Sequence, residues 1–550
     1  MPKLVLLALR TPLAIVLLAL VLAMPQARAT SDLRGNEQVA SVIEQFITSG
    51  HANLSSQVDS ERLFQIFTFY HDRDFKPIWT RDSGPKTKAR VLLEALKAAR
   101  DHGLDPARYA IPDLEMRIDS QNPEELAEFD LLMTDVFADF GRDLSQGQVI
   151  PSGLDDTHIQ PHGPGPLTLI DGAEAADDLG PYLETLAPQT PQYARLKAKL
   201  ATYRAIAAMG GWPRIAPGAT LKPGMTDPRV PGLRRMLAIT GDYPGDPGNA
   251  SQVYDPGLAA AVQAFQERHG LSVDGVIGPA THAALEVPVE ARIRQMEINM
   301  ERRRWMPDDL GERYVFVNIA DAFLKVVEDR GDREKTVLGA RLVVGKPYTR
   351  TPVFSHAMSY VEINPSWGVP ASIANKEFLP KLKENPGAML AQNIRIFSGQ
   401  TEVDPWSVDW ASLSRVPYQL RQDPGPTNAL GRIKFMFPNK HNIYIHDTPS
   451  KSLFETSARF FSHGCMRVQD PERLAEVLLG DQGWTVDRVR AQIATGQKKV
   501  VNLKNKIPVH ITYLTAWVNK DGTVHFRNDV YDRDASLAQA LLGARSGQLR

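Results

Sequence analysis

The chain of 550 residues contains a single cysteine, and the residues around it suit nucleophilic catalysis. Cys465 lies in the stretch FFSHGCMRV, after Ser462, His463 and Gly464 and before Arg467. A thiolate attacks carbonyl carbon, and a thiol of ordinary pKa needs a base or a cation nearby to ionise near neutral pH. The pattern predicts a catalytic cysteine, and the alternative is a buried cysteine that only packs.

Two histidines are close enough in the sequence to act as its base. His463 precedes Cys465 by two residues, and His446 precedes it by nineteen. His446 ends the strand-like segment NIYIHD, in which alternation turns Tyr444 and His446 away from the two isoleucines. Because the isoleucines should face the core, we expect His446 at an exposed strand end. There it can serve as the general base and acid, whereas His463 is expected to shape the pocket.

Gly464 and Arg467 have predicted supporting roles. Gly464 permits an unusual backbone conformation, so that N–H groups of Gly464 and Cys465 can face a developing oxyanion. Arg467 should share a face with Cys465 and can anchor a carboxylate. A structural ion pair is the alternative for this arginine.

The same segment could instead hold zinc. His446, His463, Cys465 and Asp447 offer the nitrogen, sulfur and oxygen atoms that zinc accepts. Their spacings match no standard zinc pattern, so a metal site is the weaker interpretation.

Strand-like segments predict a mostly β domain over residues 313–531 that carries these side chains. Near its end, Asn519-Lys520-Asp521-Gly522 separates two such segments and predicts a hairpin. Residues 370–422 interrupt the domain without strand alternation, and about 50 residues is too long for a simple loop. We expect this insertion to be a lid subdomain, because long insertions near a site often cover it.

The rest of the chain reads mainly as helix, so the predicted fold is a multidomain α+β protein. Apolar residues recur at helical spacing in the first third of the chain, which predicts a helical scaffold. A smaller unit of three short helices divided by turns follows it. The predicted boundaries are residues 30–216 for the scaffold, 217–288 for the three-helix module, 289–312 for a linking helix and 532–550 for a C-terminal tail.

The first residues resemble an export signal. An apolar run from Leu13 to Ala23 precedes Ala27-Arg28-Ala29, a small-x-small cleavage pattern, which predicts a signal peptide over residues 1–29. An uncleaved membrane anchor is the alternative. The 63 basic and 64 acidic residues are nearly balanced, so the composition gives no indication of nucleic-acid binding.

His446 followed by Cys465 within SHGCMRV resembles the catalytic signature of the L,D-transpeptidases, the YkuD-domain family. Residues 421–449 (RQDPGPTNALGRIKFMFPNKHNIYIHDTP) are similar to the YcbB-like branch of that family, and residues 69–79 and 102–109 are similar to its N-terminal scaffold. The three-helix unit, with YDPGLAAAVQAFQ and DGVIGP, resembles a peptidoglycan-binding domain.

The resemblance implies a cysteine-dependent acyltransferase of peptidoglycan biosynthesis in the periplasm. Cys465 would attack the carbonyl between diaminopimelate and D-Ala in a tetrapeptide stem, release D-Ala and hold the stem as a thioester. The amine of a second stem's diaminopimelate would resolve it into a 3→3 cross-link. Ser462, His463 and Arg467 would line the pocket.

The resemblance also bears on ligands and partners. It implies no metal or organic cofactor, peptidoglycan stem peptides as donor and acceptor, and other wall synthases as further partners. Carbapenems would acylate Cys465. Three alternatives use the same residues or module: an L,D-carboxypeptidase, an enzyme that makes or cuts a wall-to-lipoprotein link, and a non-enzymatic wall-binding scaffold.

Overall fold

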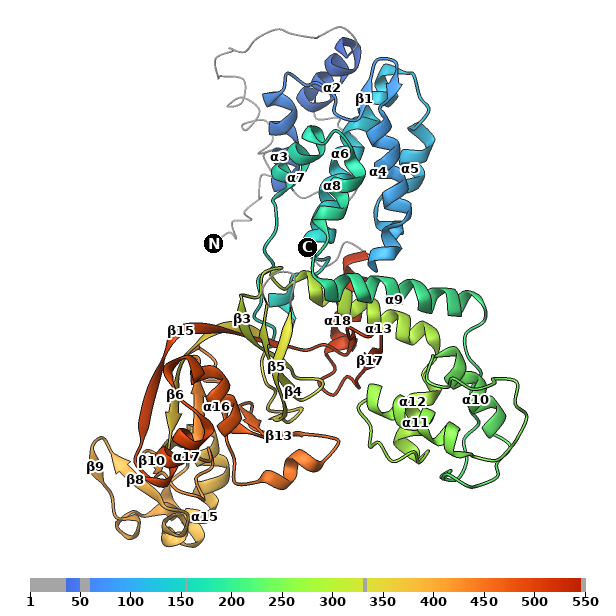
Figure 1. Ribbon diagram of the computed structural model, residues 1–550. Coiled ribbons are helices and arrows are strands. Elements are labelled where there is room, and N and C mark those ends of the chain that lie inside the picture. The colour runs from blue at the N-terminus through green and yellow to red at the C-terminus, as the bar shows by residue number, and fades with distance from the viewer. Residues whose placement is uncertain (1–35, 50–59, 155, 330–333, 546–550) are drawn as a thin grey trace, which may run out of the picture. The chain divides into compact units, whose positions relative to one another are not determined.

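The computed structural model describes residues 36–49, 60–154, 156–329 and 334–545 (Figure 1). The chain forms two compact units, one of residues 1–146 and 163–188 and the other of residues 147–162 and 189–550. The predicted signal peptide lies outside the described residues. Among those residues, no helix combines the length and the apolar character that crossing a membrane requires.

The first unit is helical, as predicted, and is built around α6 (Pro123–Ser145), which is buried along most of its length. The Asn122 side chain accepts a hydrogen bond from the N–H of Glu124, and Pro123 occupies the first helical turn, a favoured way to begin a helix. The surrounding helices are α2 (Glu37–Ser49), α3 (Ser60–Asp72), α4 (Thr87–Lys97), α5 (Ile111–Arg117), α7 (Pro166–Ala175) and α8 (Leu179–Leu186).

A buried carboxylate on α6 organises the chain between α3 and α4. Asp130 is inaccessible to solvent. It accepts hydrogen bonds from the backbone N–H groups of Ile78 and Trp79, and from the hydroxyls of Thr80 and Tyr70, at 2.6–3.0 Å. One carboxylate therefore satisfies four donors that would otherwise be buried without partners.

In the second unit, three short helices surround a small apolar core, as predicted. They are α10 (Val230–Ile239), α11 (Pro256–Arg268) and α12 (Pro279–Glu286). The buried amide of Gln266 accepts from the N–H groups of Asp274 and Gly275 and donates to the carbonyl of Val276. It fixes the turn before α12. The module is joined to the rest of its unit through α9 (Pro191–Ala208) and α13 (Val289–Arg304).

A nine-stranded sheet forms the predicted β domain, in the order β13-β5-β14-β12-β11-β6-β15-β3-β4. Because β4 also pairs with β5, eight of these strands close into a barrel and β13 attaches beside β5. The bounds are β3 (Arg313–Asn318), β4 (Phe323–Glu328), β5 (Lys335–Gly345), β6 (Phe354–Ile363), β11 (Ile433–Met436), β12 (Ile445–His446), β13 (Phe460–Ser462), β14 (Met466–Val468) and β15 (Lys499–Thr512). Two helices, α16 (Pro471–Leu479) and α17 (Val486–Ala494), complete its core.

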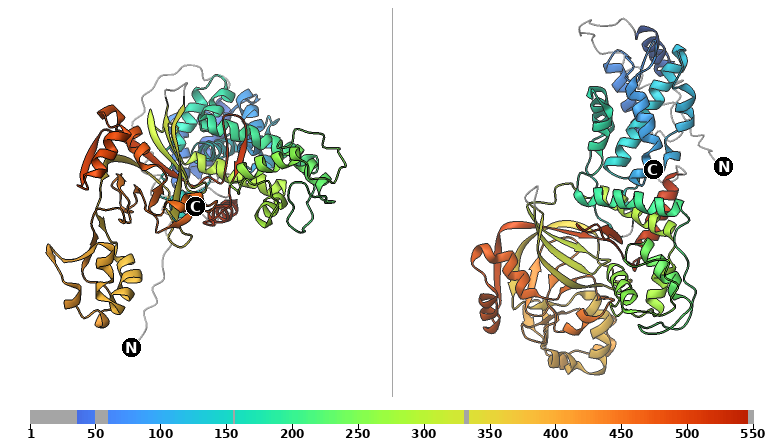
Figure 2. Two further views of the ribbon diagram at one scale, coloured as in Figure 1. Left: turned by 60° about the horizontal axis from the view of Figure 1, so that its bottom comes forward. Right: turned by 45° about the vertical axis from the view of Figure 1, so that its right-hand side comes forward.

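The insertion between β6 and β11 is a subdomain with a core of its own, formed by apolar side chains such as Leu382 and Trp410. Figure 2 shows it projecting from the barrel as a gold ribbon. The absence of strand alternation was misleading, because the insertion contains a four-stranded sheet in the order β7-β10-β8-β9. Its strands are too short to show a pattern: β7 (Trp367–Gly368), β8 (Ile394–Ser398), β9 (Thr401–Glu402) and β10 (Gln419–Gln422), with the short helices α14 (Ala371–Ile373) and α15 (Leu379–Glu384).

The end of the chain differs from the expectation of a tail. Residues 533–545 form α18 (Arg533–Arg545), whose Leu537 is buried with Trp305 at the end of α13. The predicted hairpin is present as β16 (Ala516–Val518) and β17 (Val524–Phe526), but it forms a separate sheet against α9 and α13. These contacts between segments distant in sequence leave no local pattern.

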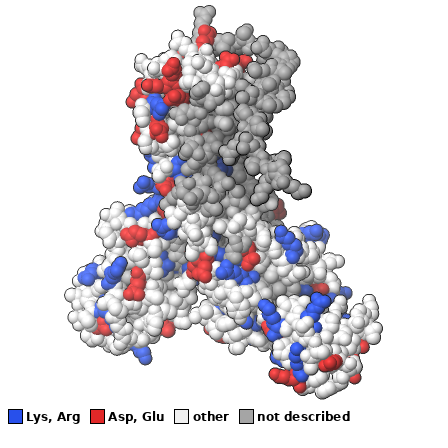
Figure 3. Space-filling view, turned by 180° about the vertical axis from the view of Figure 1, so that it is seen from behind, with Lys and Arg blue, Asp and Glu red and all other residues white. Residues whose placement is uncertain are grey.

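Basic and acidic side chains are mixed on the face drawn in Figure 3, with no extended region of one sign. On this face, electrostatic attraction to a polyanion has no continuous basic footprint to act through.

Replacing Asp130 should destabilise the helical unit. Asp130→Ala leaves several buried donors unpaired, so we expect α6 to lose about 3 kcal/mol or more of protection, measured by hydrogen–deuterium exchange in the full chain. Asp119→Ala is the matched control, because it removes only an exposed pair with Arg90 and should change protection by less than about 1 kcal/mol. Equal effects of the two substitutions would contradict this account.

Candidate active site

Cys465 sits in a bend between β13 and β14, and Gly464 makes that bend possible. Gly464 has φ +114°, and a Cβ there would lie 3.4 Å from the side chain of Ile443 and 3.5 Å from the carbonyl oxygen of Arg350. The N–H of Gly464 donates to the Ser462 hydroxyl at 3.1 Å. Ser462 in turn donates to the carbonyl of Cys465. Among the described residues, the N–H of Cys465 has no acceptor, so it is the better oxyanion donor of the two predicted.

Strand pairing places four polar side chains in one transverse row. Glu362 on β6 pairs with Lys434 on β11, Lys434 pairs with His446 on β12, and His446 pairs with Arg467 on β14. The neighbouring row is apolar and buried in the barrel, and consists of Val361, Phe435, Ile445 and Met466. Alternation therefore turns the polar row away from the core. Tyr444 lies on the same face, two residues before His446.

The expectation that His446 is exposed was wrong, since its side chain is only 5% exposed. The carbonyl groups of Asp447 and Leu430 both interact with the imidazole, so the turn that contains Leu430 covers the strand end. Nδ1 donates to the Asp447 carbonyl at 2.5 Å, which leaves Nε2 unprotonated in the neutral ring. Burial, followed by the charges of Arg467 and Lys434, lowers the pKa of His446 to about 3. His446 is therefore neutral near pH 7.

Cys465 is also neutral at rest. Burial raises the pKa of its thiol, and hydrogen bonds from Tyr444 and the charges of Lys434 and Arg467 oppose that increase. The thiol donates to the carbonyl of Asn442, with Sγ and O 3.6 Å apart. In the described part of the chain no hydrogen bond joins Cys465 to His446. Such contacts are often long in unliganded enzymes and shorten when substrate binds.

Tyr444 connects the members of the site. Its hydroxyl hydrogen-bonds to Cys465 and also to Trp367. The Lys434 ammonium lies 4.0 Å from the centre of its ring, and the ring centroids of Tyr444 and His446 are 5.6 Å apart. Burial, and then the charge of Cys465, raise the pKa of the Tyr444 hydroxyl, so it remains a proton donor.

The inserted subdomain reaches this site at two points. Trp367, at its start, contacts Tyr444, and Glu377 lies 2.7 Å from Nε2 of His463. The predicted pocket residue His463 is therefore held by the insertion. The role of the inserted subdomain as a lid that opens and closes remains a prediction.

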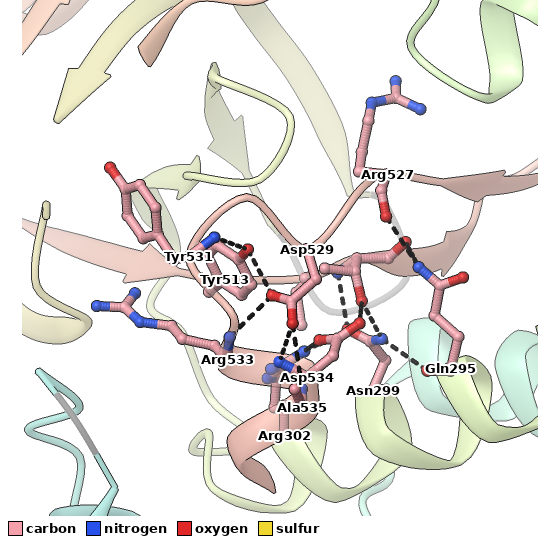
Figure 4. Close-up of polar contacts among 12 residues, drawn as sticks. Gln295, Asn299, Arg302, Tyr513, Arg527, Asp529, Tyr531, Arg533, Asp534 and Ala535 are labelled. Carbon is pink, nitrogen blue, oxygen red and sulfur yellow. Dashed lines mark hydrogen bonds and ion pairs between the residues drawn. The ribbon is translucent and has the colours of Figure 1, made fainter. Parts of the chain in front are cut away.

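A chain of hydrogen bonds supports the bend at Gly464 and Cys465, which we call the nucleophile bend after its predicted nucleophile. Asp529 accepts from Tyr513 and from the first N–H groups of α18, and the Tyr513 hydroxyl accepts from the N–H of Tyr531 (Figure 4). The Tyr531 hydroxyl donates to Gly345 and accepts from the N–H of Thr351. The Thr351 hydroxyl then donates to the carbonyl of Gly464 at 2.7 Å. The position of the bend thus depends on the C-terminal helix.

Sequence reasoning missed Lys434, Thr351 and Tyr531. Lys434 could have been found, because it is a charged residue at an alternating position in the strand RIKFMFP. Thr351 and Tyr531 carried no such signal, since their contacts with the site join segments far apart in the sequence. As for the zinc alternative, the described residues include no group of three or more His, Cys, Asp or Glu side chains placed to hold a metal ion.

A closed barrel that presents a thiol on a glycine-dependent bend, near a neutral imidazole, suits acyl transfer by a cysteine nucleophile. Residues 312–509 match the family model of the L,D-transpeptidase catalytic domain, YkuD. Residues 226–285 match the model "Putative peptidoglycan binding domain", and residues 65–200 match a scaffold domain. The chain therefore combines a YkuD-type L,D-transpeptidase catalytic domain with a peptidoglycan-binding domain and a helical scaffold.

Known proteins resemble parts of the chain. A curated Haemophilus influenzae protein named "Putative L,D-transpeptidase" is 36% identical over 254 residues, which are 46% of this chain and 50% of the relative. The match thus spans about half of the relative's length. Two crystal structures each cover 54% of this chain and are covered completely: the L,D-transpeptidase of Xylanimonas cellulosilytica (18% identity, TM-score 0.18) and a fused Zn-dependent amidase/peptidase/peptidoglycan-binding protein of Clostridium acetobutylicum (11%, 0.15). These TM-scores are too low to support an argument.

The thiol should ionise only at alkaline pH in the free protein. Because the folded-state pKa of Cys465 is raised, its alkylation by iodoacetamide should increase with pH through a midpoint above the ordinary value of about 8.5. Mass spectrometry reports this rate without background from other thiols, since the chain has one cysteine. A midpoint below pH 7 would instead indicate a resting thiolate–imidazolium pair.

Thr351→Val should loosen the nucleophile bend. The substitution keeps the shape but leaves the Gly464 carbonyl without its donor, which costs about 1–3 kcal/mol. We expect lower stability and faster alkylation of Cys465 at a fixed pH. Thr351→Ser retains the hydroxyl and should behave like the wild type. If Val and Ser give the same alkylation rate, the hydroxyl does not hold the bend.

Proposed function

We propose that this protein is a peptidoglycan L,D-transpeptidase that forms 3→3 cross-links between diaminopimelate residues. The observation that carries the proposal is a YkuD catalytic domain whose single cysteine lies on a glycine-dependent bend near a neutral imidazole. The peptidoglycan-binding domain in the same unit supports a wall substrate. Export to the periplasm through residues 1–29 is part of the proposal.

In the first half-reaction, Cys465 would attack the carbonyl between diaminopimelate and D-Ala of the donor stem. His446 takes the thiol proton on Nε2, because its Nδ1 already donates to a carbonyl group. The N–H of Cys465 faces the developing oxyanion. The proton then passes to the leaving nitrogen, D-Ala departs, and the stem remains as a thioester on Sγ.

In the second half-reaction, the side-chain amine of an acceptor diaminopimelate would attack this thioester. His446 accepts the amine proton, the new amide forms, and the thiol of Cys465 is regenerated. Transfer to an amine requires that water be kept from the thioester. The inserted subdomain, which contacts Tyr444 and His463, supports transfer over hydrolysis.

Incubating the protein with tetrapeptide muropeptides tests the proposal. Mass spectrometry should detect 3→3 dimers and free D-Ala with the wild type, and Cys465→Ala should abolish both. His446→Gln should reduce dimer formation by about 10²–10⁴-fold, because it removes the base but not the nucleophile. D-Ala release without dimers would assign an L,D-carboxypeptidase instead. An unchanged dimer yield with Cys465→Ala would refute the nucleophile.

A further inference from the structure

Two cations flank His446 without an anionic partner. Lys434 and Arg467 lie on either side of it in the polar row, and both are half-buried. Within the described ranges, no carboxylate oxygen comes within 4 Å of either cation. The nearest acidic residue in the row, Glu362, instead pairs with Lys498 at 3.4 Å. The Nε of Arg467 is buried, and no described residue accepts a hydrogen bond from it.

Two buried arginines elsewhere in the same unit have carboxylate partners, whereas Arg292 is buried and donates instead to Gln295 and to the carbonyl of Ala284. Arg268 pairs with Asp242, and Arg302 pairs with Asp534. Leaving a partly buried charge without a counter-ion is costly, so such a cation indicates either strain or a place that an anion occupies. Here two of them converge on the side chains that would perform the chemistry. Both act on the charge of Cys465 and both lower the pKa of His446.

We propose that Lys434 and Arg467 form a carboxylate-binding site beside Cys465 that receives a carboxylate of the donor stem peptide. This inference rests on the proposed function and specifies how the donor is recognised. A guanidinium can bind a carboxylate with two parallel hydrogen bonds, and an ammonium adds a compact charge from the other side. The donor offers two such groups, the terminal carboxylate of D-Ala and the side-chain carboxylate of diaminopimelate.

Occupation of this site would activate the base. In the free protein, the two cations oppose protonation of His446. Glu362, opposite Lys434, raises the pKa of that lysine, but no described carboxylate forms an ion pair with Lys434 or Arg467. Glu362 is held by Lys498, and the Asp447 carboxylate accepts from the N–H of Arg432 and pairs with Lys451. A bound carboxylate neutralises the cations, so Nε2 of His446 accepts the proton of Cys465 more readily. The thiol then stays protonated until a donor arrives.

Binding to Cys465→Ala protein, which cannot react, tests the recognition step. Calorimetry would compare the free tetrapeptide with two analogues, one amidated at D-Ala and one amidated at the diaminopimelate side chain. Amidating the carboxylate that occupies the site should weaken affinity about tenfold or more. The comparison therefore shows which of the two carboxylates binds. Lys434→Met should weaken binding of the free tetrapeptide to a similar extent and should not change binding of the analogue amidated at that carboxylate. Lys434→Arg should largely restore binding of the free tetrapeptide. Lys504→Met, which removes an exposed lysine of β15 outside the polar row, is the matched control and should have little effect.

A second measurement does not depend on the proposed function. N-acetyl-D-alanine is a small carboxylate probe, and the imidazole of His446 can be followed by NMR in ¹³C-histidine-labelled protein, assigned with His446→Gln. Without the probe, His446 should stay neutral down to pH 4, and saturating probe should make it titrate within pH 4–7. The carboxamide of the probe should have no effect, and Lys434→Met should abolish the shift.

The outcomes separate the two proposals. If all three peptides bind equally, or if Lys434→Met weakens acid and amide alike, the carboxylate site is refuted even when cross-links form. If the probe raises the pH at which His446 titrates but no dimer or D-Ala appears with the wild type, the carboxylate site stands and the transpeptidase assignment fails. Thermal unfolding of Lys434→Met and Lys434→Arg identifies any loss of folding, and the restoration expected with arginine would not follow from a folding defect.

Discussion

The site depends on the parallel register between β12 and β14. That pairing sets Ile445 beside Met466 and His446 beside Arg467, so Cys465, one residue before β14, comes to the same end of the barrel as the histidine. Parallel neighbours need a crossover connection, and here the segment between them also supplies β13, which attaches to β5. A shift of one residue in this register would turn His446 into the core and Ile445 outward. The register between β12 and β14 therefore both completes this part of the barrel and places the candidate catalytic side chains.

Burial acts in opposite directions on the two candidate catalytic groups. It raises the pKa of the Cys465 thiol and lowers the pKa of the His446 imidazole, so each is neutral in the free protein. A neutral thiol is a poor target for oxidation, so the resting protein protects its single cysteine. The cost is that neither group is ready to react alone. The unpaired cations on either side of His446 offer a way for the substrate to change that balance.

Two structural elements hold the nucleophile bend from different directions. Behind it, Tyr531 and Thr351 connect the carbonyl of Gly464 to the hydrogen bonds that anchor α18. On the other side, the inserted subdomain contacts Tyr444 and His463. The first connection consists of buried hydrogen bonds, whereas the pair between Glu377 and His463 is partly exposed and correspondingly weak. The buried and the partly exposed contacts to the bend thus come from different parts of the catalytic domain.

Much of the organisation could be predicted from local pattern. The uniqueness of Cys465, the glycine before it, the three short helices, the succession of strands and the Asn519–Gly522 hairpin all follow from residue type and spacing. The sequence did not reveal that His446 is buried, that Lys434 joins the site, that the insertion contains a sheet, or that the last residues form α18. Alternation determines which face of a strand a side chain occupies, but only the tertiary structure decides what covers that face. Pairing between distant strands, and the turn that contains Leu430, turned a predicted exposed histidine into a buried neutral one beside two cations.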